Sequence, residues 1–258
     1  MTIPLPYQNV LSISAFFQGR RNFRVGVAVL QPIKAMMAGF NLPQRPAAIF
    51  GGNMLKIYGQ ARSRTYRVIW LCTESNIPFE HDPVTIHVPD ATAKSDWYRA
   101  LNPNARVPTI DDDGFVMWES AAINLYLARK YKSPLWPDTV QGEGRAYQWG
   151  FFISNDLEQP MTTVFQHRVL IPPERRDAAL ADTCDKALQS KLQVLEGHLA
   201  TNKYFGIDKW DLADFMVASV TFTLHGMKYD LAMYPKFAAW LAASVERPGS
   251  KVAMKYRA

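Results

Sequence analysis

The segment MLKIYGQARSRTYRVIWLC, residues 54–72, decides the fold of this chain. Its first part, residues 55–59, is short and mostly apolar, which predicts a β-strand. Residues 64–76 predict a helix, because one face carries the apolar side chains of Val68, Ile69, Leu71 and Cys72. Ser63 lies in the turn between these two elements. A strand, a turn and a helix in this order predict the start of an α/β domain.

The following residues predict three more strands and a second helix. Residues 79–86 read as an extended segment, and a linking segment follows them. ARVPTIDDDGFVMW, residues 105–118, predicts a β-hairpin with strands at 107–110 and 115–118 and an Asp-Asp-Gly turn at 112–114. Ser120 is expected to cap a helix that runs to Lys132 and ends before Pro134. These elements predict a small α/β domain around a four-stranded mixed sheet.

Strand signals disappear after the linker at residues 132–144, and the rest of the chain predicts a helical bundle. Helices are expected at 145–165, 174–201, 209–224 and 238–245. Asp211 is placed as the N-cap of the third of these, with Asp214 completing a capping box and Trp210 and Phe215 forming a hydrophobic staple. The long first helix offers candidates for a second binding site, although core packing is the alternative for each of them: Phe151, Phe152, Asn155 and Met161.

Composition and charge argue against a nucleic-acid-binding protein. The net charge is +6, but residues 1–53 hold five basic and no acidic side chains, so the remainder, with 24 basic and 23 acidic side chains, is almost neutral. A protein that binds the phosphate backbone is expected to keep a basic face on its folded part. Cys72 and Cys184 cannot form a disulfide framework and favour a reducing compartment. The five histidines lack the spacing of a metal site, so we expect no metal.

Residues 1–53 differ from the rest of the chain in having no clean periodicity. We expect a poorly structured N-terminal extension, with Met54 as the natural start of the protein; a disordered tail or a targeting segment is the alternative. The sequence has no apolar run of 18 residues, so we expect no transmembrane helix and no membrane partner.

Five phrases resemble the cytosolic glutathione transferases, in particular the bacterial branch related to the theta and zeta classes. In the order and spacing of that family they are LKIYGQARSRTYRV (55–68), LNPNARVPTIDDDG (101–114), WESAAINLYLARKY (118–131), FFISNDLEQP (151–160) and DLADFMVASV (211–220). The resemblance implies an α/β thioredoxin-like, glutathione-binding domain at residues 54–133 and an all-α helical C-terminal domain at 144–258. It also supports Met54 as the start, because members of the family commonly begin with a methionine just before the first strand.

The hairpin segment matches the family's N-P-x-x-x-V-P turn at Asn102, Pro103, Val107 and Pro108. In the family this proline is cis, and it turns the backbone of the preceding residue toward the cysteinyl part of glutathione. The resemblance therefore implies that Val107 and Pro108 bind glutathione and that Arg106 lies near its glycyl carboxylate. The alternatives are an ordinary trans proline at a strand start and an exposed surface arginine.

Glu119 and Ser120 stand where the family binds the γ-glutamyl end of glutathione. A helix N-terminus has free N–H groups and positive potential, so an anion fits there. The resemblance implies that Ser120 bonds the γ-glutamyl carboxylate and that Glu119 pairs with the ammonium group. The alternative is an N-cap serine preceded by a surface glutamate.

Ser63 is the candidate catalytic residue. It stands five residues after Tyr58 and four before Arg67, the spacing of the theta-type serine, and its hydroxyl can donate a hydrogen bond to a thiolate. Tyr58 is the runner-up, since it matches the catalytic tyrosine of mammalian-type transferases; Arg64 would then match a glutathione-binding arginine. The zeta-type serine also stands five residues after its tyrosine, but that class continues with Ser-Cys where this chain has Arg64-Thr65, which puts a zeta assignment, and with it isomerase activity, in doubt.

The resemblance implies a glutathione S-transferase that conjugates the glutathione thiolate to small hydrophobic electrophiles, as in detoxification. Glutathione is the co-substrate, no metal is needed, and a cytoplasmic homodimer is implied. Two alternatives stay open: a glutathione-dependent isomerase, dehalogenase or peroxidase on the same site, or a non-catalytic glutathione-fold binding protein.

Overall fold

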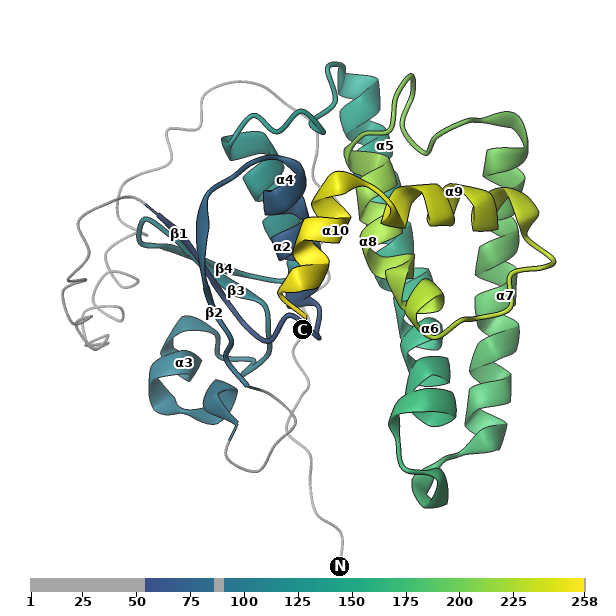
Figure 1. The fold of residues 1–258 in the computed structure, drawn as a ribbon, viewed down its shortest axis with the longest axis horizontal. Helices are drawn as coiled ribbons and strands as arrows, with labels where there is room; N and C mark the ends of the chain where they lie inside the picture. The colour runs from purple at the N-terminus through teal and green to yellow at the C-terminus, as the bar shows by residue number, and fades with distance from the viewer. Residues whose placement is uncertain (1–53, 86–90, 258) are drawn as a thin grey trace, which may run out of the picture. The chain divides into compact units, whose positions relative to one another are not determined.

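The computed structural model of the chain describes residues 54–85 and 91–257, so the predicted extension at 1–53 lies outside the described residues. The first half of this part contains four strands and several helices (Figure 1). In chain order they are β1 (Leu55–Tyr58), α2 (Thr65–Glu74), β2 (Phe79–Asp82), the short 3-10 helix η2 (Thr92–Lys94), α3 (Asp96–Leu101), β3 (Thr109–Asp112), β4 (Phe115–Trp118) and α4 (Ser120–Lys130).

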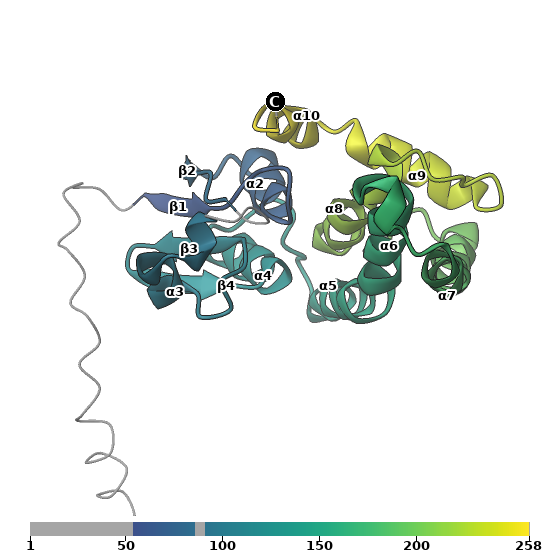
Figure 2. The same ribbon diagram turned by 90° about the horizontal axis from the view of Figure 1, so that it is seen from below.

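The strands form one mixed sheet in the order β2-β1-β3-β4. β1 pairs in parallel with β2 and antiparallel with β3, and β3 pairs antiparallel with β4. Successive side chains of a strand face opposite sides. Ile57 accordingly joins Ile110 in the core beneath α2 and α4, whereas Tyr58 joins Tyr98 of α3 in a smaller cluster on the other face. α3 lies on the side of the sheet away from α2 and α4 (Figure 2). The predicted α/β fold with a four-stranded mixed sheet, thioredoxin-like in its arrangement, is confirmed.

The hairpin differs from its predicted boundaries at both ends of its first strand. β3 begins at Thr109 instead of residue 107, because Pro108 has no N–H to donate to a neighbouring strand. β3 continues through Asp112, so the turn consists of Asp113 and Gly114 alone, with φ values of 54° and 88°. Asp-Gly favours this two-residue hairpin turn, which needs positive φ at both positions. The segment predicted to be a simple link also contains α3.

The second half of the described chain is helical, as predicted. It contains α5 (Val140–Phe152), η3 (Ile153–Leu157), α6 (Glu158–Phe165), η4 (Gln166–Leu170), η5 (Pro173–Arg175), α7 (Ala178–Thr201), α8 (Leu212–Gly226), α9 (Pro235–Val245) and α10 (Pro248–Lys255). The helix predicted at 145–165 begins earlier, at Val140, because the Thr139 side chain accepts the Gly142 N–H. It is also divided by the π-helical turn η3. In the described ranges, no helix is long and apolar enough to cross a bilayer.

α8 forms the centre of the helical half, and most of its side chains are buried. The predicted capping box is confirmed, since the Asp211 carboxylate accepts the Ala213 N–H at 2.8 Å and the Asp214 side chain accepts the Asp211 N–H. The predicted staple is also present: the Trp210 and Phe215 rings meet edge to face at 6.5 Å. These contacts fix the start of the helix that supports α5.

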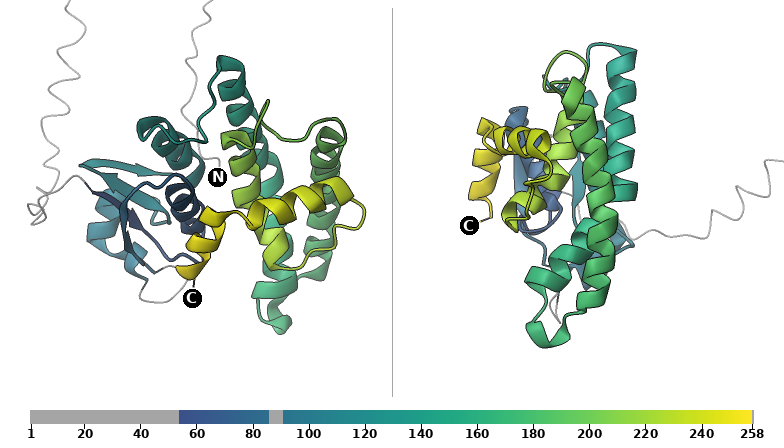
Figure 3. Two further views of the ribbon diagram at one scale, coloured as in Figure 1. Left: turned by 45° about the horizontal axis from the view of Figure 1, so that its top comes forward. Right: turned by 90° about the vertical axis from the view of Figure 1, so that its right-hand side faces the viewer.

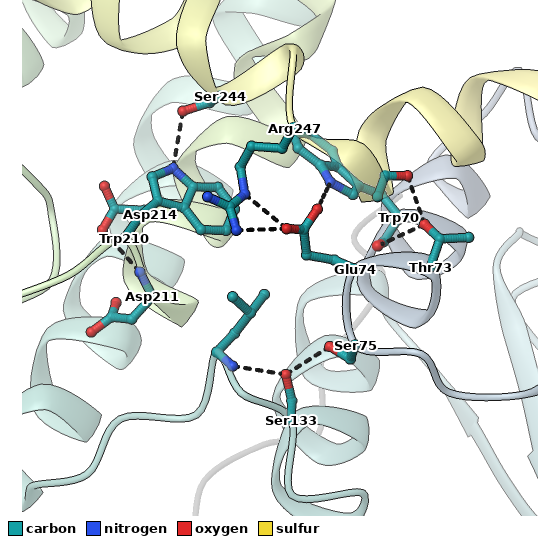
Figure 4. A network of polar contacts seen from close by, with 12 residues as sticks. Trp70, Thr73, Glu74, Ser75, Ser133, Trp210, Asp211, Asp214, Ser244 and Arg247 are labelled. Atoms are coloured by element: carbon teal, nitrogen blue, oxygen red, sulfur yellow. Dashed lines mark hydrogen bonds and ion pairs between the residues drawn. The ribbon is translucent and has the colours of Figure 1, made fainter.

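α10 lies beyond the last predicted helix, at 238–245, and it was not predicted because Arg247-Pro248-Gly249 is typical of the end of a helix. Proline also fits the first turn of a helix, and Pro248 occupies such a position. α10 lies along α2 (Figures 1 and 3). The Arg247 guanidinium contacts the Glu74 carboxylate at 2.6 Å and 2.8 Å (Figure 4). The Thr73 hydroxyl donates to the Gly249 carbonyl oxygen at 2.7 Å.

Candidate active site

The turn between β1 and α2, residues 59–64, lies against the segment before Pro108. Gly59 has a φ of +133°, and a Cβ there would lie 2.2 Å from Thr65 Oγ1 and 2.7 Å from Val107 Cβ. Both separations are far below van der Waals contact, so a glycine is required. The Ser63 turn and the Val107 segment, far apart in sequence, are therefore close neighbours.

Ser63 stands at the amino end of α2 and is half-buried. The Ser63 hydroxyl donates to the Gln60 carbonyl oxygen at 2.6 Å, and the Ser63 hydroxyl oxygen accepts the Thr65 N–H at 3.1 Å. The hydroxyl therefore lies in the positive potential of a helix start. To donate to a bound sulfur, its proton has to leave the Gln60 carbonyl, which needs only a rotation about one bond.

Tyr58, the runner-up, is buried on the α3 side of the sheet. Its ring centre lies 6.1 Å from that of Trp97 and 6.3 Å from that of Tyr98, and Lys56 Nζ lies 5.0 Å from it. Only 7% of Tyr58 is exposed. The ring is thus enclosed by aromatic neighbours, whereas Ser63 has a helix terminus beside it. This difference favours Ser63.

One pocket gathers all five residues predicted to bind glutathione. It is lined by Arg64, Asn102, Arg106, Val107, Pro108, Glu119 and Ser120. The Val107–Pro108 bond is cis, as predicted. Ser63 and Tyr58 do not line this pocket; Ser63 is next to it through its neighbour Arg64.

Two buried side chains hold the backbone of Arg106 in the wall of the pocket. The Arg106 carbonyl accepts the Tyr98 hydroxyl at 2.7 Å and the Asn102 side-chain amide at 2.9 Å. The same two side chains hydrogen-bond Thr109 Oγ1, at 2.8 Å and 3.0 Å. Burial raises the pKa of Tyr98 to about 12, so its hydroxyl stays protonated at neutral pH. The Arg106 side chain is exposed and free to reach toward a ligand.

The start of α4 forms the opposite wall. The predicted cap was wrong by one residue: Ser120 is the first helical residue, and Glu119 is the N-cap. The reason is the backbone of Glu119, whose φ of 77° and ψ of 108° end the preceding strand abruptly. Among the described residues, no side chain accepts a hydrogen bond from the N–H groups of the first turn of α4. These N–H groups are therefore available to a ligand in the pocket. This arrangement suits a carboxylate.

Three charges join α2 to α6 beside the pocket. Glu158 accepts two hydrogen bonds from Arg67, both at 3.0 Å, and a third from Arg64 Nε. The Arg67 and Glu158 side chains are each only 10% exposed. Burial by itself disfavours the carboxylate, but the two guanidinium groups outweigh it and hold the pKa of Glu158 at about 2. The cluster keeps one net positive charge and fixes Arg64 at the pocket wall.

Sequence reasoning missed Glu158 and the role of Arg67. Both residues lie in phrases that resemble the family, but the pattern does not show which charged side chains become buried. One signal was available: Arg67 stands between Tyr66 and Val68 in a helix that is otherwise apolar at this point. A charged residue in such a position predicts a buried partner of opposite charge.

A second pocket lies on the other side of Ser120, between α4, α5 and α8. Its lining residues are Arg67, Ser120, Ala121, Asn124, Gly150, Ile153, Ser154, Met216, Ser219 and Val220. Asn124 is buried, and its Oδ1 has no hydrogen-bond partner among the described residues. Half of the lining residues are polar or charged, so this pocket lacks the predominantly apolar wall that a hydrophobic electrophile needs.

The side chains considered for an electrophile site line neither of these two pockets. Met161 is a core residue, 1% exposed, and Phe151 lies on the surface, 62% exposed. Phe152 packs edge to face on Trp149 at 5.7 Å. Neither pocket is lined by these residues or by Asn155.

The same two halves are found in known proteins. Family models described as "Glutathione S-transferase, N-terminal domain" and "Glutathione S-transferase, C-terminal domain" match residues 63–130 and 159–248. Glutathione S-transferase GstB of Escherichia coli strain K12 is 30% identical over 58% of this chain and 74% of its own. Mouse glutathione S-transferase theta-1 is 31% identical over 72% of this chain and 80% of its own. A solved structure of glutathione S-transferase-I bound with lactoylglutathione has a TM-score of 0.71 and 25% identity, and the match covers 79% of this chain and 99% of that chain.

A thioredoxin-like domain with a cis-proline pocket, followed by a helical domain, defines a two-domain glutathione-dependent protein. The chain belongs to the glutathione S-transferase family, a family of transferases. The family resemblance of the five phrases is therefore confirmed. The bacterial theta- and zeta-related branch stays a prediction.

Proposed function

We propose that this transferase conjugates the thiolate of glutathione to small hydrophobic electrophiles, with Ser63 stabilising the thiolate. The observation that carries the proposal is the pocket that brings the Val107–Pro108 segment together with the start of α4, beside the turn that holds Ser63. The glutathione-binding part is proposed to be residues 54–133, and the helical part, residues 144–258, is proposed to shape the second site.

The pocket offers one group for each charged part of glutathione. The free N–H groups at the start of α4 and the Ser120 hydroxyl are proposed to bind the γ-glutamyl carboxylate, while Glu119 pairs with the ammonium group. Arg106 is proposed to pair with the glycyl carboxylate. The Val107 backbone is left to bind the cysteinyl unit. These contacts would direct the sulfur toward the Ser63 turn.

Ionisation of the sulfur is the chemical requirement, because a free thiol titrates near about 8.5 and only the thiolate is a good nucleophile. A hydrogen bond from Ser63, the start of α2 and the net positive Arg64–Glu158–Arg67 cluster all favour the anion. The thiol proton leaves to solvent. The sulfur then forms a bond to the electrophilic carbon, and the electron pair of the broken bond departs with the leaving group or moves onto the acceptor.

The experiment that tests this function combines retention on immobilised glutathione with a spectrophotometric conjugation assay on the same protein. We expect both to be positive. Retention without conjugation, isomerisation, dehalogenation or peroxide reduction would instead make the chain a glutathione-binding protein. If the protein does not bind glutathione, the assignment of this pocket as a glutathione site is wrong.

Replacing Arg106 with alanine should weaken glutathione binding about tenfold or more, because a charge-assisted hydrogen bond to a carboxylate is lost. Calorimetric titration with glutathione measures this dissociation constant. Arg99→Ala is the matched control, since Arg99 is an exposed arginine of α3 outside the pocket lining. Equal affinities for wild type and Arg106→Ala would contradict the proposed contact.

We also propose a homodimer formed through β4 and α5. Large apolar side chains are exposed on both elements: Phe115 is 51% and Trp118 37% exposed on β4, and Phe151 is 62% exposed on α5. Exposed aromatic groups of this size are typical of a surface that is covered by a partner. Light scattering should give twice the mass of one chain for the wild-type protein. Phe151→Asp should lower the measured mass toward that of a single chain. Met233→Asp, at a position 83% exposed in the loop before α9, should stay dimeric.

The cytoplasm is the proposed place of action. Cys72 and Cys184 are both free, which fits a compartment whose thiols are kept reduced. Glutathione is itself part of the cytoplasmic redox buffer, so the co-substrate is present there.

A further inference from the structure

We propose that Tyr256 and Arg257, the two residues after α10, are positioning residues that hold the turn at 59–64 and thereby place the Ser63 hydroxyl. We call these two residues the anchor. The inference rests on the proposed role of Ser63 and extends it to a segment almost 200 positions away in the sequence.

Arg257 is joined to the turn in both directions. Arg62 Nε donates to the Arg257 carbonyl oxygen at 2.8 Å, and Arg257 Nη1 donates to the Ala61 carbonyl oxygen at 3.4 Å. The guanidinium group is itself held over the Tyr66 ring, at 5.1 Å, and over the Phe222 ring, at 5.3 Å. Arg257 therefore links the residues just before Ser63 to the aromatic core between α2 and α8.

Tyr256 supports the other end of the same turn. Its ring centre lies 5.7 Å from that of His81 and 5.5 Å from that of Phe79, both in β2. His81 Nε2 in turn donates to the Gly59 carbonyl oxygen at 2.7 Å. The anchor thus contacts the turn directly at residues 61 and 62 and, through His81, at residue 59.

Other contacts hold the two ends of the turn: the Gly59 and Gln60 N–H groups donate to the Asp82 and Val84 carbonyl oxygens at 2.8 Å and 3.1 Å, and Arg64 pairs with Glu158. Between these ends, at residues 61 and 62, the hydrogen bonds to the rest of the described protein are those made with Arg257. Ala61 is buried, but Arg62 and Arg64 are exposed, and Gln60 and Ser63 are only half-buried. With few buried side chains, the position of the backbone depends on hydrogen bonds such as those made by the anchor. The position matters because a displacement of about 1 Å at a reacting group can cost about 100-fold in rate.

The anchor is not needed to dock α10, so its removal should leave the fold intact. α10 is fixed to α2 along its length by other contacts: Tyr66 hydrogen-bonds Ser250 Oγ at 2.9 Å, and Arg247 pairs with Glu74 (Figure 4). Gly249 lies so close to α2 that a Cβ there would be 2.5 Å from Glu74 Cα. Substitutions at 256 and 257 therefore test the turn rather than the packing of the helix.

The test compares wild type with Arg257→Ala, Tyr256→Ala and the conservative Arg257→Lys. Lys255→Ala is the matched control, because Lys255 is an exposed cation in the last turn of α10. Hydrogen–deuterium exchange of peptides covering 58–66 is measured without glutathione. Steady-state conjugation is measured across pH with glutathione.

We expect exchange at 58–66 to become about tenfold faster in Arg257→Ala, with kcat about tenfold lower and KM for glutathione within about twofold of wild type. The pH at which conjugation reaches half its maximum should rise, because a displaced hydroxyl stabilises the thiolate less. Arg257→Lys should restore part of the rate, since an ammonium group can also donate to the Ala61 carbonyl. Lys255→Ala should match wild type.

Unchanged exchange at 58–66 in Arg257→Ala, or faster exchange with an unchanged rate and pH profile, would overturn the inference. A wild-type protein that binds no glutathione would be a different failure, that of the proposed function. In that case the exchange measurement still shows whether the anchor holds the turn, and only the link to catalysis is refuted.

Discussion

Replacing Ser63 with alanine is expected to lower kcat for conjugation about 100-fold and to leave glutathione binding within about threefold of wild type. The reason is that a single preorganised donor to a developing or bound anion contributes a factor of about 100 to 1,000. Ser63 does not line the proposed glutathione pocket, so the proposed contacts to the ends of the peptide remain in the variant. The loss should therefore fall on kcat rather than on KM for glutathione.

Tyr58→Phe is the matched variant, because it removes a hydroxyl from the only other candidate without changing the size of the ring. We expect it to keep at least about half the wild-type rate. Steady-state kinetics with saturating glutathione measure both variants. If Tyr58→Phe loses the activity and Ser63→Ala keeps it, Tyr58 is the thiolate ligand and the assignment of Ser63 is wrong.

Replacing Glu158 with glutamine is expected to lower the free energy of unfolding by about 3 kcal/mol. Arg67 is 90% covered in the folded protein, and the variant leaves it without a charged partner. Removing one member of a buried ion pair typically costs about 3–5 kcal/mol. Chemical denaturation measures the difference. Glu246→Gln is the control, since its partner Lys251 and the Glu246 side chain are both well exposed, at 61% and 69%, and little change is expected.

The stabilisation of the folded protein by Glu158 should decrease as the pH falls. The pKa of this carboxyl is about 2 in the folded protein, against 4.5 for an ordinary glutamate, so the folded state binds its proton less readily than the unfolded state does. Its contribution is complete above pH 4.5 and is lost as the pH falls through 2. The stability difference between wild type and Glu158→Gln should shrink over that interval. A difference that stays constant with pH would contradict the ion pair.

The pH measurement has to be taken as a difference between the two proteins. Burial raises the pKa of Asp211 and of Asp214 to about 6, so each favours the folded state more when protonated and makes stability fall as the pH rises from 3.8 through 6. Neither carboxyl shares a hydrogen-bond partner with Glu158, and both are present in both proteins. Their contribution cancels in the comparison.

The sequence predicted those parts of the fold that depend on local pattern. The short, mostly apolar strand β1, the apolar face of α2 and the Asp-Gly turn each depend on only a few neighbouring residues, and the structure contains all three. The capping box at Asp211 and Asp214 is equally local. The residues of the proposed glutathione pocket were predicted for a different reason: they stand in phrases whose order and spacing resemble a family.

The parts that could not be predicted depend on contacts between distant residues. The Arg67–Glu158 pair joins positions 91 apart, and the Arg257–Ala61 contact joins positions 196 apart, so no window of sequence contains both partners. α10 was missed because proline both ends and begins helices, and only its packing on α2 distinguishes the two. The cap of α4 was misplaced by one residue, because a glutamate gives no sequence signal for the positive φ that Glu119 adopts.

The most direct measurement is a titration of the thiol of glutathione bound to the protein, followed by the ultraviolet absorbance of the thiolate. A bound thiol pKa at least about one unit below the value of about 8.5 for a free thiol is predicted for wild type, with a return toward the free value in Ser63→Ala. A bound thiol that titrates like free glutathione in the wild-type protein would contradict the account.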